Sequence, residues 1–169
     1  LSLGPTTSYL TNAANACQNA GILILESAGN DNVENDAALY VPDYLHTRTG
    51  VLAVAATTQN DSKASFSNYG TWVEISAPGV SILSTYYSHI SGESTYTSLQ
   101  GTSMSCPITA RAAALLWSAN PGYSYQQISQ LLMDSADDIE GMNGGYIGKL
   151  GAGRVNLLRA LGDNEHQFP

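Results

Sequence analysis

The residues best suited to covalent chemistry stand in the stretch Gly-Thr-Ser-Met-Ser-Cys-Pro at positions 101–107. Ser103 opens an apolar run whose spacing predicts a helix over about 103–120, with Thr102 as its N-cap. The first turn of a helix has unpaired N–H groups and the positive end of the helix dipole, so it would stabilise an oxyanion beside Ser103. Pro107 removes the helical partner of the Ser103 carbonyl and loosens that turn. One interpretation is a nucleophilic serine; the other is a serine that only caps the helix.

A second stretch, Ser-Ala-Gly-Asn at 27–30, could complete such a site. The apolar run at 22–25 predicts a buried strand, and ligands bind at the carboxyl ends of strands in open α/β sheets. Asn30 would therefore bring an amide N–H donor to the place where acyl transfer develops negative charge. The alternative is that Asn30, Asp31 and Asn32 form only a turn rich in Asx residues.

The elements that must position these motifs alternate between helices and strands. Helical spacing predicts a helix over 8–20, and another opens at Ser124 with a capping box to Gln127. Strands are expected at 22–25, 51–57, 73–78 and 81–85, and a hairpin or extended edge at 86–99. Buried strands between helices predict an α/β fold with a mostly parallel sheet.

Length and charge limit the classes of function. A chain of 169 residues suits one domain or a large piece of one, and 43% apolar residues can form an ordinary core. The net charge of −8 argues against a nucleic acid or an anionic membrane as partner, because both need a basic face. No apolar run reaches the 18 or so residues that a membrane span needs.

The two motifs together resemble those of the subtilisin-like serine proteases. "GTSMSCP" is similar to the family's nucleophile motif, "SAGN" to its oxyanion motif, and "SLG" at 2–4 to a strand of its substrate cleft. "SAPGVSILST" at 76–85 resembles the segment upstream of the nucleophile. The resemblance implies the three-layer subtilisin-like fold with a mostly parallel sheet, and a secreted serine endopeptidase.

The resemblance also implies roles for individual residues. Ser103 would be the nucleophile that forms an acyl-enzyme, Asn30 and the Ser103 N–H the oxyanion donors, and Thr102 would position the turn. A polypeptide substrate would lie in extended form between two walls. The expected walls are Ser2, Leu3 and Gly4 on one side, and Ser27, Ala28 and Gly29 on the other.

A serine hydroxyl is a poor nucleophile without a base, and the family's aspartate and histidine motifs do not occur in this chain. None of the three histidines, His46, His89 and His166, matches the family's base. We therefore expect residues 1–161 to be the C-terminal part of a protease domain, with a polar tail at 162–169. Its sheet would be incomplete at the N-terminal side, its partner would be the missing N-terminal part, and the piece alone would be inactive.

Some residues depart from the family pattern and keep a second hypothesis open, a non-catalytic pseudoprotease or scaffold with the same fold. Ile108 replaces a usual histidine, and Arg111 replaces a small residue, although a long stem could carry its charge outward. Glu26 replaces a small residue before "SAGN". It would either point into the cleft and favour basic substrates, or point inward and need a buried partner.

The chemistry itself requires no cofactor. Structural calcium is a possibility, because oxygen ligands suit Ca²⁺ and family members often bind it. The alternative is a solvated acidic loop. The candidate ligands are Asp31, Asn32, Glu34, Asn35, Asp36 and Asp43.

Overall fold

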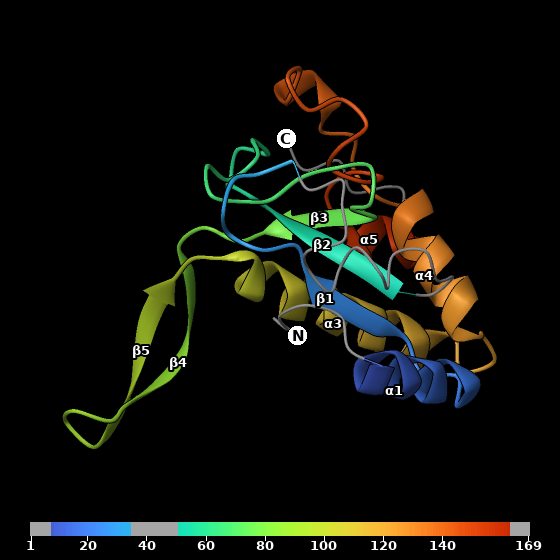
Figure 1. Ribbon diagram of the computed structural model, residues 1–169, viewed down its shortest axis with the longest axis horizontal. Helices are drawn as coiled ribbons and strands as arrows, with labels where there is room; N and C mark the ends of the chain where they lie inside the picture. The colour runs from blue at the N-terminus through green and yellow to red at the C-terminus, as the bar shows by residue number, and fades with distance from the viewer. Residues whose placement is uncertain (1–7, 35–50, 163–169) are drawn as a thin grey trace.

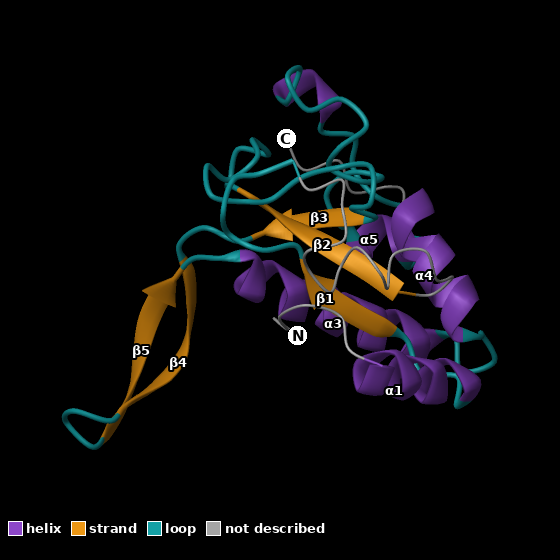
Figure 2. Ribbon diagram, in the orientation of Figure 1, coloured by secondary structure: helices purple, strands orange, loops and turns teal. Residues whose placement is uncertain are grey.

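The computed structural model describes residues 8–34 and 51–162. Figures 1 and 2 show a small sheet with helices beside it and one hairpin that projects from the body. The elements in chain order are α1 (Ser8–Asn19), β1 (Ile24–Ser27), β2 (Val51–Thr57), β3 (Ile75–Pro78), β4 (Ile82–Ser88), β5 (Glu93–Leu99), α3 (Thr102–Ala119), α4 (Tyr125–Asp134), the 3-10 turn η1 (Glu140–Met142) and α5 (Leu157–Ala160).

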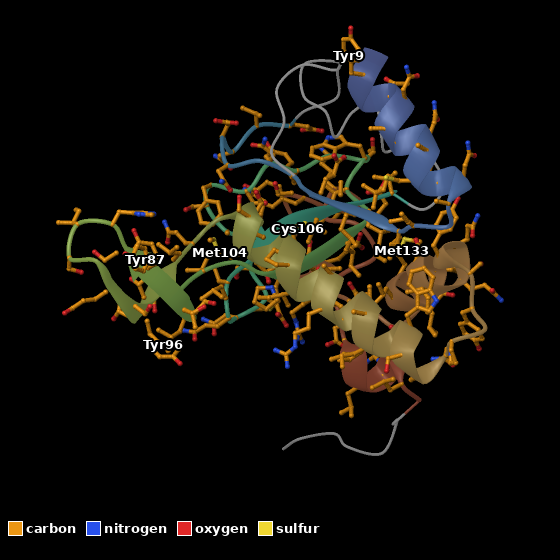
Figure 3. All side chains as sticks on the ribbon, turned by 90° about the horizontal axis from the view of Figure 1, so that it is seen from below. Tyr9, Tyr87, Tyr96, Met104, Cys106 and Met133 are labelled. Carbon is orange, nitrogen blue, oxygen red and sulfur yellow. The ribbon has the colours of Figure 1, made fainter. Side chains whose placement is uncertain are left out.

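The central sheet has the order β1-β2-β3, and both pairs of strands are parallel. Ile24 of β1 pairs with Val51, and Val54 of β2 pairs with Ile75 of β3. The long helix α3 packs across all three strands, and α4 and α5 pack against α3. Figure 3 shows α1 on the opposite side of the sheet from α3. These layers confirm the predicted α/β fold with a mostly parallel sheet.

Strand β2 is the centre of the core, and both of its faces are covered. Leu52 and Val54 point into an apolar cluster that includes Leu116 of α3. Ala53 and Ala55 point to the other face, where Trp72 belongs to a second cluster. The continuous apolar run predicted at 51–57 is therefore a strand buried on both sides, as expected for a parallel sheet between two layers.

The first strand begins two residues later than its apolar run predicts. The cause is the end of α1, where Gly21 adopts a φ of 74° and the Ile22 N–H bonds the Cys17 carbonyl at 2.9 Å. This αL ending uses Ile22 to close the helix. Ile22 is consequently half exposed, and pairing with β2 starts only at Ile24.

Strands β4 and β5 form a separate antiparallel hairpin that does not extend the main sheet. Ile82 pairs with Leu99 at its base, and Ser88 pairs with Glu93 at its far end. The hairpin predicted at 86–99 is therefore present but begins earlier, because β4 joins the strand predicted at 81–85 to the first residues of that segment. Figure 1 shows the hairpin leaving the body beside the start of α3.

The start of α3 is fastened to the carboxyl ends of β2 and β3. The Gly79 N–H bonds the Thr57 carbonyl at 2.9 Å, and the Gly79 carbonyl accepts from the Gly101 N–H at 2.8 Å. In addition, the Ser105 hydroxyl donates to the Ala77 carbonyl at 2.9 Å. Three hydrogen bonds therefore hold the N-terminal end of α3 at the carboxyl ends of the strands.

We predict that Gly79→Ala destabilises the protein, because a Cβ there would lie 2.4 Å from the Ser105 oxygen and 2.9 Å from the Gly101 carbonyl. Overpacking of this kind costs about 1–3 kcal/mol. Urea unfolding should show that loss. Gly145→Ala is the matched control, since a Cβ at Gly145 meets nothing within 4 Å. Equal stabilities of the two variants would contradict the close fit at Gly79.

Two acidic side chains flank Ala53 in the core. Glu26 of β1 is only 1% exposed, so it points inward and not into a cleft, and its Oε1 has no hydrogen-bond partner within the described part of the chain. The Glu74 carboxylate accepts from the Ala53 N–H at 2.5 Å. Burial raises the pKa of Glu26 to about 7. Burial, reinforced by the charge of Glu26, raises the pKa of Glu74 to about 8.

We predict that the free energy of unfolding falls as the pH is raised from about 5 to about 8.5. The folded pKa values exceed those of an unfolded chain, so this contribution is complete below about pH 4.5 and disappears as the pH rises through the folded values. Glu26→Gln should make the free energy of unfolding less dependent on pH. It should raise that free energy by at most about 3 kcal/mol at high pH. Chemical unfolding at several pH values measures this, with Glu93→Gln on the hairpin as control. An unchanged slope in Glu26→Gln would contradict the prediction.

Candidate active site

The two motifs meet although they are 72 residues apart in the chain. Asn30 follows β1, and its Oδ1 accepts two hydrogen bonds from Thr102, the first residue of α3. The Thr102 N–H donates at 2.9 Å and the Thr102 hydroxyl at 3.0 Å. The same hydroxyl accepts from the Gly29 N–H at 3.1 Å. Thr102 therefore joins the end of β1 to the mouth of α3, and its side chain is fully buried there.

These bonds orient the Asn30 amide. Because Oδ1 is held by Thr102, the Nδ2 donor is fixed beside Gly101, where a Cβ would come within 3.4 Å of it. Gly101 has a φ of 149°, a conformation that favours glycine. The prediction that Thr102 caps α3 is wrong in detail. Gly101 occupies the N-cap position and has no side chain to cap with, so Asn30 caps the helix from a distant strand.

Ser103 is exposed on the first turn of α3. Its main-chain N–H belongs to the set of helix N-terminal groups that have no partner within the helix. The 18 residues of α3 add the positive end of the helix dipole at the same point. A carbonyl attacked by the Ser103 hydroxyl would thus form its oxyanion beside this N–H and near the Asn30 amide. The arrangement suits acyl transfer.

Asn68 holds the loop that carries Asn30, a role that the sequence did not reveal. Its Nδ2 donates to the Ala28 carbonyl at 3.1 Å, and its Oδ1 accepts from the N–H groups of Asp31 at 2.9 Å and Val33 at 3.2 Å. Gly29 has a φ of 101°, and a Cβ there would lie 2.4 Å from Asn68 Nδ2. One buried amide thus braces both sides of Asn30.

Lys63 is a second support that sequence reasoning missed. Its ammonium donates to Asn32 Oδ1 at 2.8 Å, to the Ser67 carbonyl at 2.9 Å and to the Ala64 carbonyl at 3.1 Å. The rings of Tyr69 and Tyr146 lie about 5 Å from the same nitrogen. Burial lowers the pKa of Lys63. A charge paired with oxygens and aromatic faces in this way ties the loop after β1 to the loop at 63–69.

The predicted peptide-binding walls are described only in part. Ser2, Leu3 and Gly4 lie outside the described residues. Ser27 and Ala28 are buried, and the Ala28 N–H bonds the Val54 carbonyl at 3.0 Å. The Gly29 N–H is bonded to Thr102. The N–H and carbonyl groups of Ala28 and Gly29 therefore all make hydrogen bonds inside the protein.

A base for Ser103 does not come from the described histidine. His89 follows β4 in the turn of the hairpin, and its ring packs edge-on against Tyr87 with centroids 5.1 Å apart. That turn is at the far end of the hairpin from α3 (Figure 1). His46 and His166 lie outside the described residues.

Two of the candidate calcium ligands are paired with lysines. Asn32 Oδ1 accepts from Lys63, and Glu34 forms an ion pair with Lys149 at 2.5 Å. Asn35, Asp36 and Asp43 are outside the described residues. Among residues 8–34 and 51–162, no group of three or more His, Cys, Asp or Glu side chains could hold a metal ion. Calcium binding by this loop stays a prediction.

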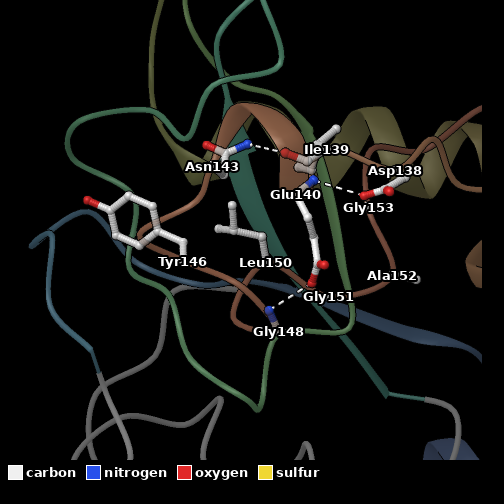
Figure 4. A pocket seen from close by; sticks show the side chains of 10 residues that line it. All are labelled: Asp138, Ile139, Glu140, Asn143, Tyr146, Gly148, Leu150, Gly151, Ala152 and Gly153. Atoms are coloured by element: carbon white, nitrogen blue, oxygen red, sulfur yellow. Dashed lines mark hydrogen bonds between the residues drawn. The ribbon is translucent and has the colours of Figure 1, made fainter.

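A cavity of about 320 Å³ lies in the loops after α4, and Figure 4 shows its lining. Its polar groups bond one another: Glu140 Oε1 accepts from the Gly148 N–H at 2.9 Å, and Asp138 Oδ1 accepts from the Glu140 N–H at 2.8 Å. Asn143 Nδ2 donates to the Ile139 carbonyl at 2.7 Å. None of the motif residues lines this cavity, and its internal hydrogen bonds indicate a structural role.

Comparisons with known proteins agree with the geometry. The model of the Subtilase family matches residues 1–162. Thermitase from Thermoactinomyces vulgaris is 42% identical over 163 residues, which are 95% of this chain and 52% of thermitase. A thermostable alkaline protease from Halalkalibacterium halodurans is 44% identical over 138 residues, 80% of this chain and 35% of that protein.

Solved structures of proteases have a similar fold over nearly all of this chain. A protease of Pseudoalteromonas arctica superposes with a TM-score of 0.80 at 29% identity, over 96% of this chain and 49% of that one. The patellamide maturation protease PatA gives 0.73 at 32% identity, over 95% and 58%. The chain thus spans about half the length of the relatives it matches. With the family model covering residues 1–162 and the two motifs in contact, the chain belongs to the subtilase family.

Proposed function

We propose that this chain carries the nucleophile and the oxyanion site of a serine endopeptidase that hydrolyses peptide bonds through an acyl-enzyme on Ser103. The observation that carries the proposal is the contact between Thr102 and Asn30, which aims an amide donor at the helix mouth where Ser103 is exposed. Membership of the subtilase family supports it. Such preorganised donors act where charge develops and cost no reorganisation during the reaction.

In the proposed reaction, the Ser103 oxygen attacks the substrate carbonyl and a base takes the hydroxyl proton. The carbonyl oxygen becomes an oxyanion that accepts from the Ser103 N–H and from Asn30 Nδ2. Collapse expels the amine, which takes the proton back from the base. Water, deprotonated by the same base, then releases the acyl group as a carboxylic acid and restores the Ser103 hydroxyl. The base and its orienting carboxylate are proposed to come from residues outside this chain. Residues 1–169 alone are therefore proposed to be inactive, and the missing segment of the same domain to be their partner.

The proposed substrate is a polypeptide in extended form. The walls would be the Ser2–Gly4 segment and the loop at Ser27–Gly29. We also propose that the protein is secreted, as the family resemblance implies. Among the described residues, no helix has the length and apolar character needed to cross a membrane.

A non-catalytic relative is the second candidate, and it is favoured by the lack of the triad motifs in this sequence. The two residues of α3 that depart from the family pattern give this second candidate little support. Arg111 is exposed, so its charge reaches solvent and does not disturb the packing of α3. Ile108 packs against the main apolar cluster, where it adds buried apolar surface.

The test of the enzyme proposal is labelling with a fluorophosphonate, which reacts with a serine only when a base activates it. We expect the whole protein that contains this chain to be labelled at Ser103 and residues 1–169 alone to be unlabelled. Peptide mapping locates the label. Ser103→Ala should abolish labelling, and Ser118→Ala, on the exposed side of the same helix, should retain it. A folded whole protein that stays unlabelled would contradict the enzyme proposal and favour the scaffold.

We predict that Thr102→Val lowers kcat about tenfold with little change in KM, because Asn30 keeps one of its two bonds to residue 102 and loses its fixed orientation. The Gly29 N–H also loses its acceptor, which costs about 1–2 kcal/mol of stability. Steady-state kinetics of the whole protein with a peptide substrate measure the first effect, and urea unfolding measures the second. Thr102→Ser keeps the hydroxyl and should restore both. If Thr102→Val were as active as the wild type, the positioning role would be refuted.

A further inference from the structure

The β4–β5 hairpin exposes several large side chains to solvent. Antiparallel pairing places Leu83, Tyr87 and Tyr96 on one face, because Tyr87 is two residues from Thr85, the partner of Tyr96. Leu83 is 67% exposed, Tyr87 50% and Tyr96 70%. Figure 3 shows Tyr87 and Tyr96 on the hairpin, away from the helices. A two-stranded hairpin is marginally stable alone, and exposed apolar surface of this kind marks interaction sites.

The composition of the hairpin is that of a protein-binding surface. Eleven of the 18 residues at 82–99 are Ser, Thr or Tyr. This is the combination used by antibody-combining loops, in which tyrosines supply rigid amphipathic contact area and small hydroxyl residues adapt their hydrogen bonds. No Lys or Arg occurs between Lys63 and Arg111. A nucleic acid or an anionic membrane would need such cations, so the surface suits a polypeptide.

The hairpin is continuous with the candidate active site. Gly79 precedes β4 and Gly101 follows β5, and the hydrogen bond between them at 2.8 Å closes the base of the hairpin. Ser103 is only four residues beyond Leu99, the last residue of β5. The base of the hairpin is therefore close to Ser103 along the chain, and Leu83, Tyr96 and Tyr87 follow at increasing distance from that base.

We propose that this face, which we call the tyrosine face (Leu83, Tyr87 and Tyr96), binds a segment of the substrate polypeptide that lies beyond the residues at the scissile bond. The inference rests on the proposed function. An extended segment would lie across the two rings while the scissile bond sits at Ser103, so long polypeptides would be held at two places and short peptides at one. Two linked contacts raise the effective concentration of the scissile bond at the nucleophile.

The experiment compares two substrates of the whole protein, unfolded β-casein and a tetrapeptide p-nitroanilide too short to reach the hairpin. For Tyr87→Ser/Tyr96→Ser we expect the ratio of kcat/KM for β-casein to kcat/KM for the tetrapeptide to fall about tenfold, since exposed aromatic anchors dominate such contacts. Tyr86→Ser is the matched control, because Tyr86 is equally part of β4 but on the opposite face. An unchanged ratio in the double variant would overturn the proposal.

Binding without catalysis separates this proposal from the proposed function. In the Ser103→Ala form, the dissociation constant of β-casein should rise about tenfold in the double variant and stay unchanged in Tyr86→Ser. A wild type that cleaves neither substrate would refute the proposed function, and the binding result would still decide whether the face holds a polypeptide.

If sedimentation velocity showed a wild-type dimer that the double variant dissociates, a second copy would occupy the face. If the double variant unfolded or lost both activities together, a segment of the same protein would occupy it. Either result would overturn the proposal.

Discussion

The pair of hydrogen bonds between Thr102 and Asn30 is the constraint on which the rest of the site depends. It connects the end of β1 to the first turn of α3, and a third bond from the Gly29 N–H makes the Thr102 hydroxyl a junction. This contact has two structural consequences. It satisfies the first N–H of a helix whose N-cap is a glycine, and it fixes the Asn30 amide donor beside Gly101.

Around this junction the fold supplies rigidity from both sides. Gly79 and Ser105 fasten the mouth of α3 to the ends of β2 and β3. Asn68 and Lys63 hold the loop after β1 through its main chain and through Asn32. Glycines occur where these supports approach so closely that a Cβ would overlap them, as at Gly79 and Gly29. Asn30 and Ser103 are therefore carried by a layer of partly to fully buried hydrogen bonds.

Two acidic side chains lie in the core behind these hydrogen bonds, where burial disfavours their charged forms. Glu26 is buried in the strand that leads to the oxyanion loop, and Glu74 is on the other side of Ala53. Both carboxyl groups hold their protons to unusually high pH because burial disfavours the charged form. The core behind the site thus has a stability that depends on pH, while Ser103 and Asn30 are exposed.

Local pattern by itself determined a large part of this protein. The run at 51–57 is buried on both faces, Ser124 and Gln127 form the capping box, and the motifs containing Ser103 and Asn30 place those residues at a helix start and after a strand, because these features depend on neighbours in the chain. Only the tertiary structure decided that Asn30 caps α3, that Asn68 and Lys63 brace its loop, and that Glu26 points inward. Each of these contacts joins residues that are far apart in sequence, and no local spacing carries information about a partner that the fold brings in from another strand.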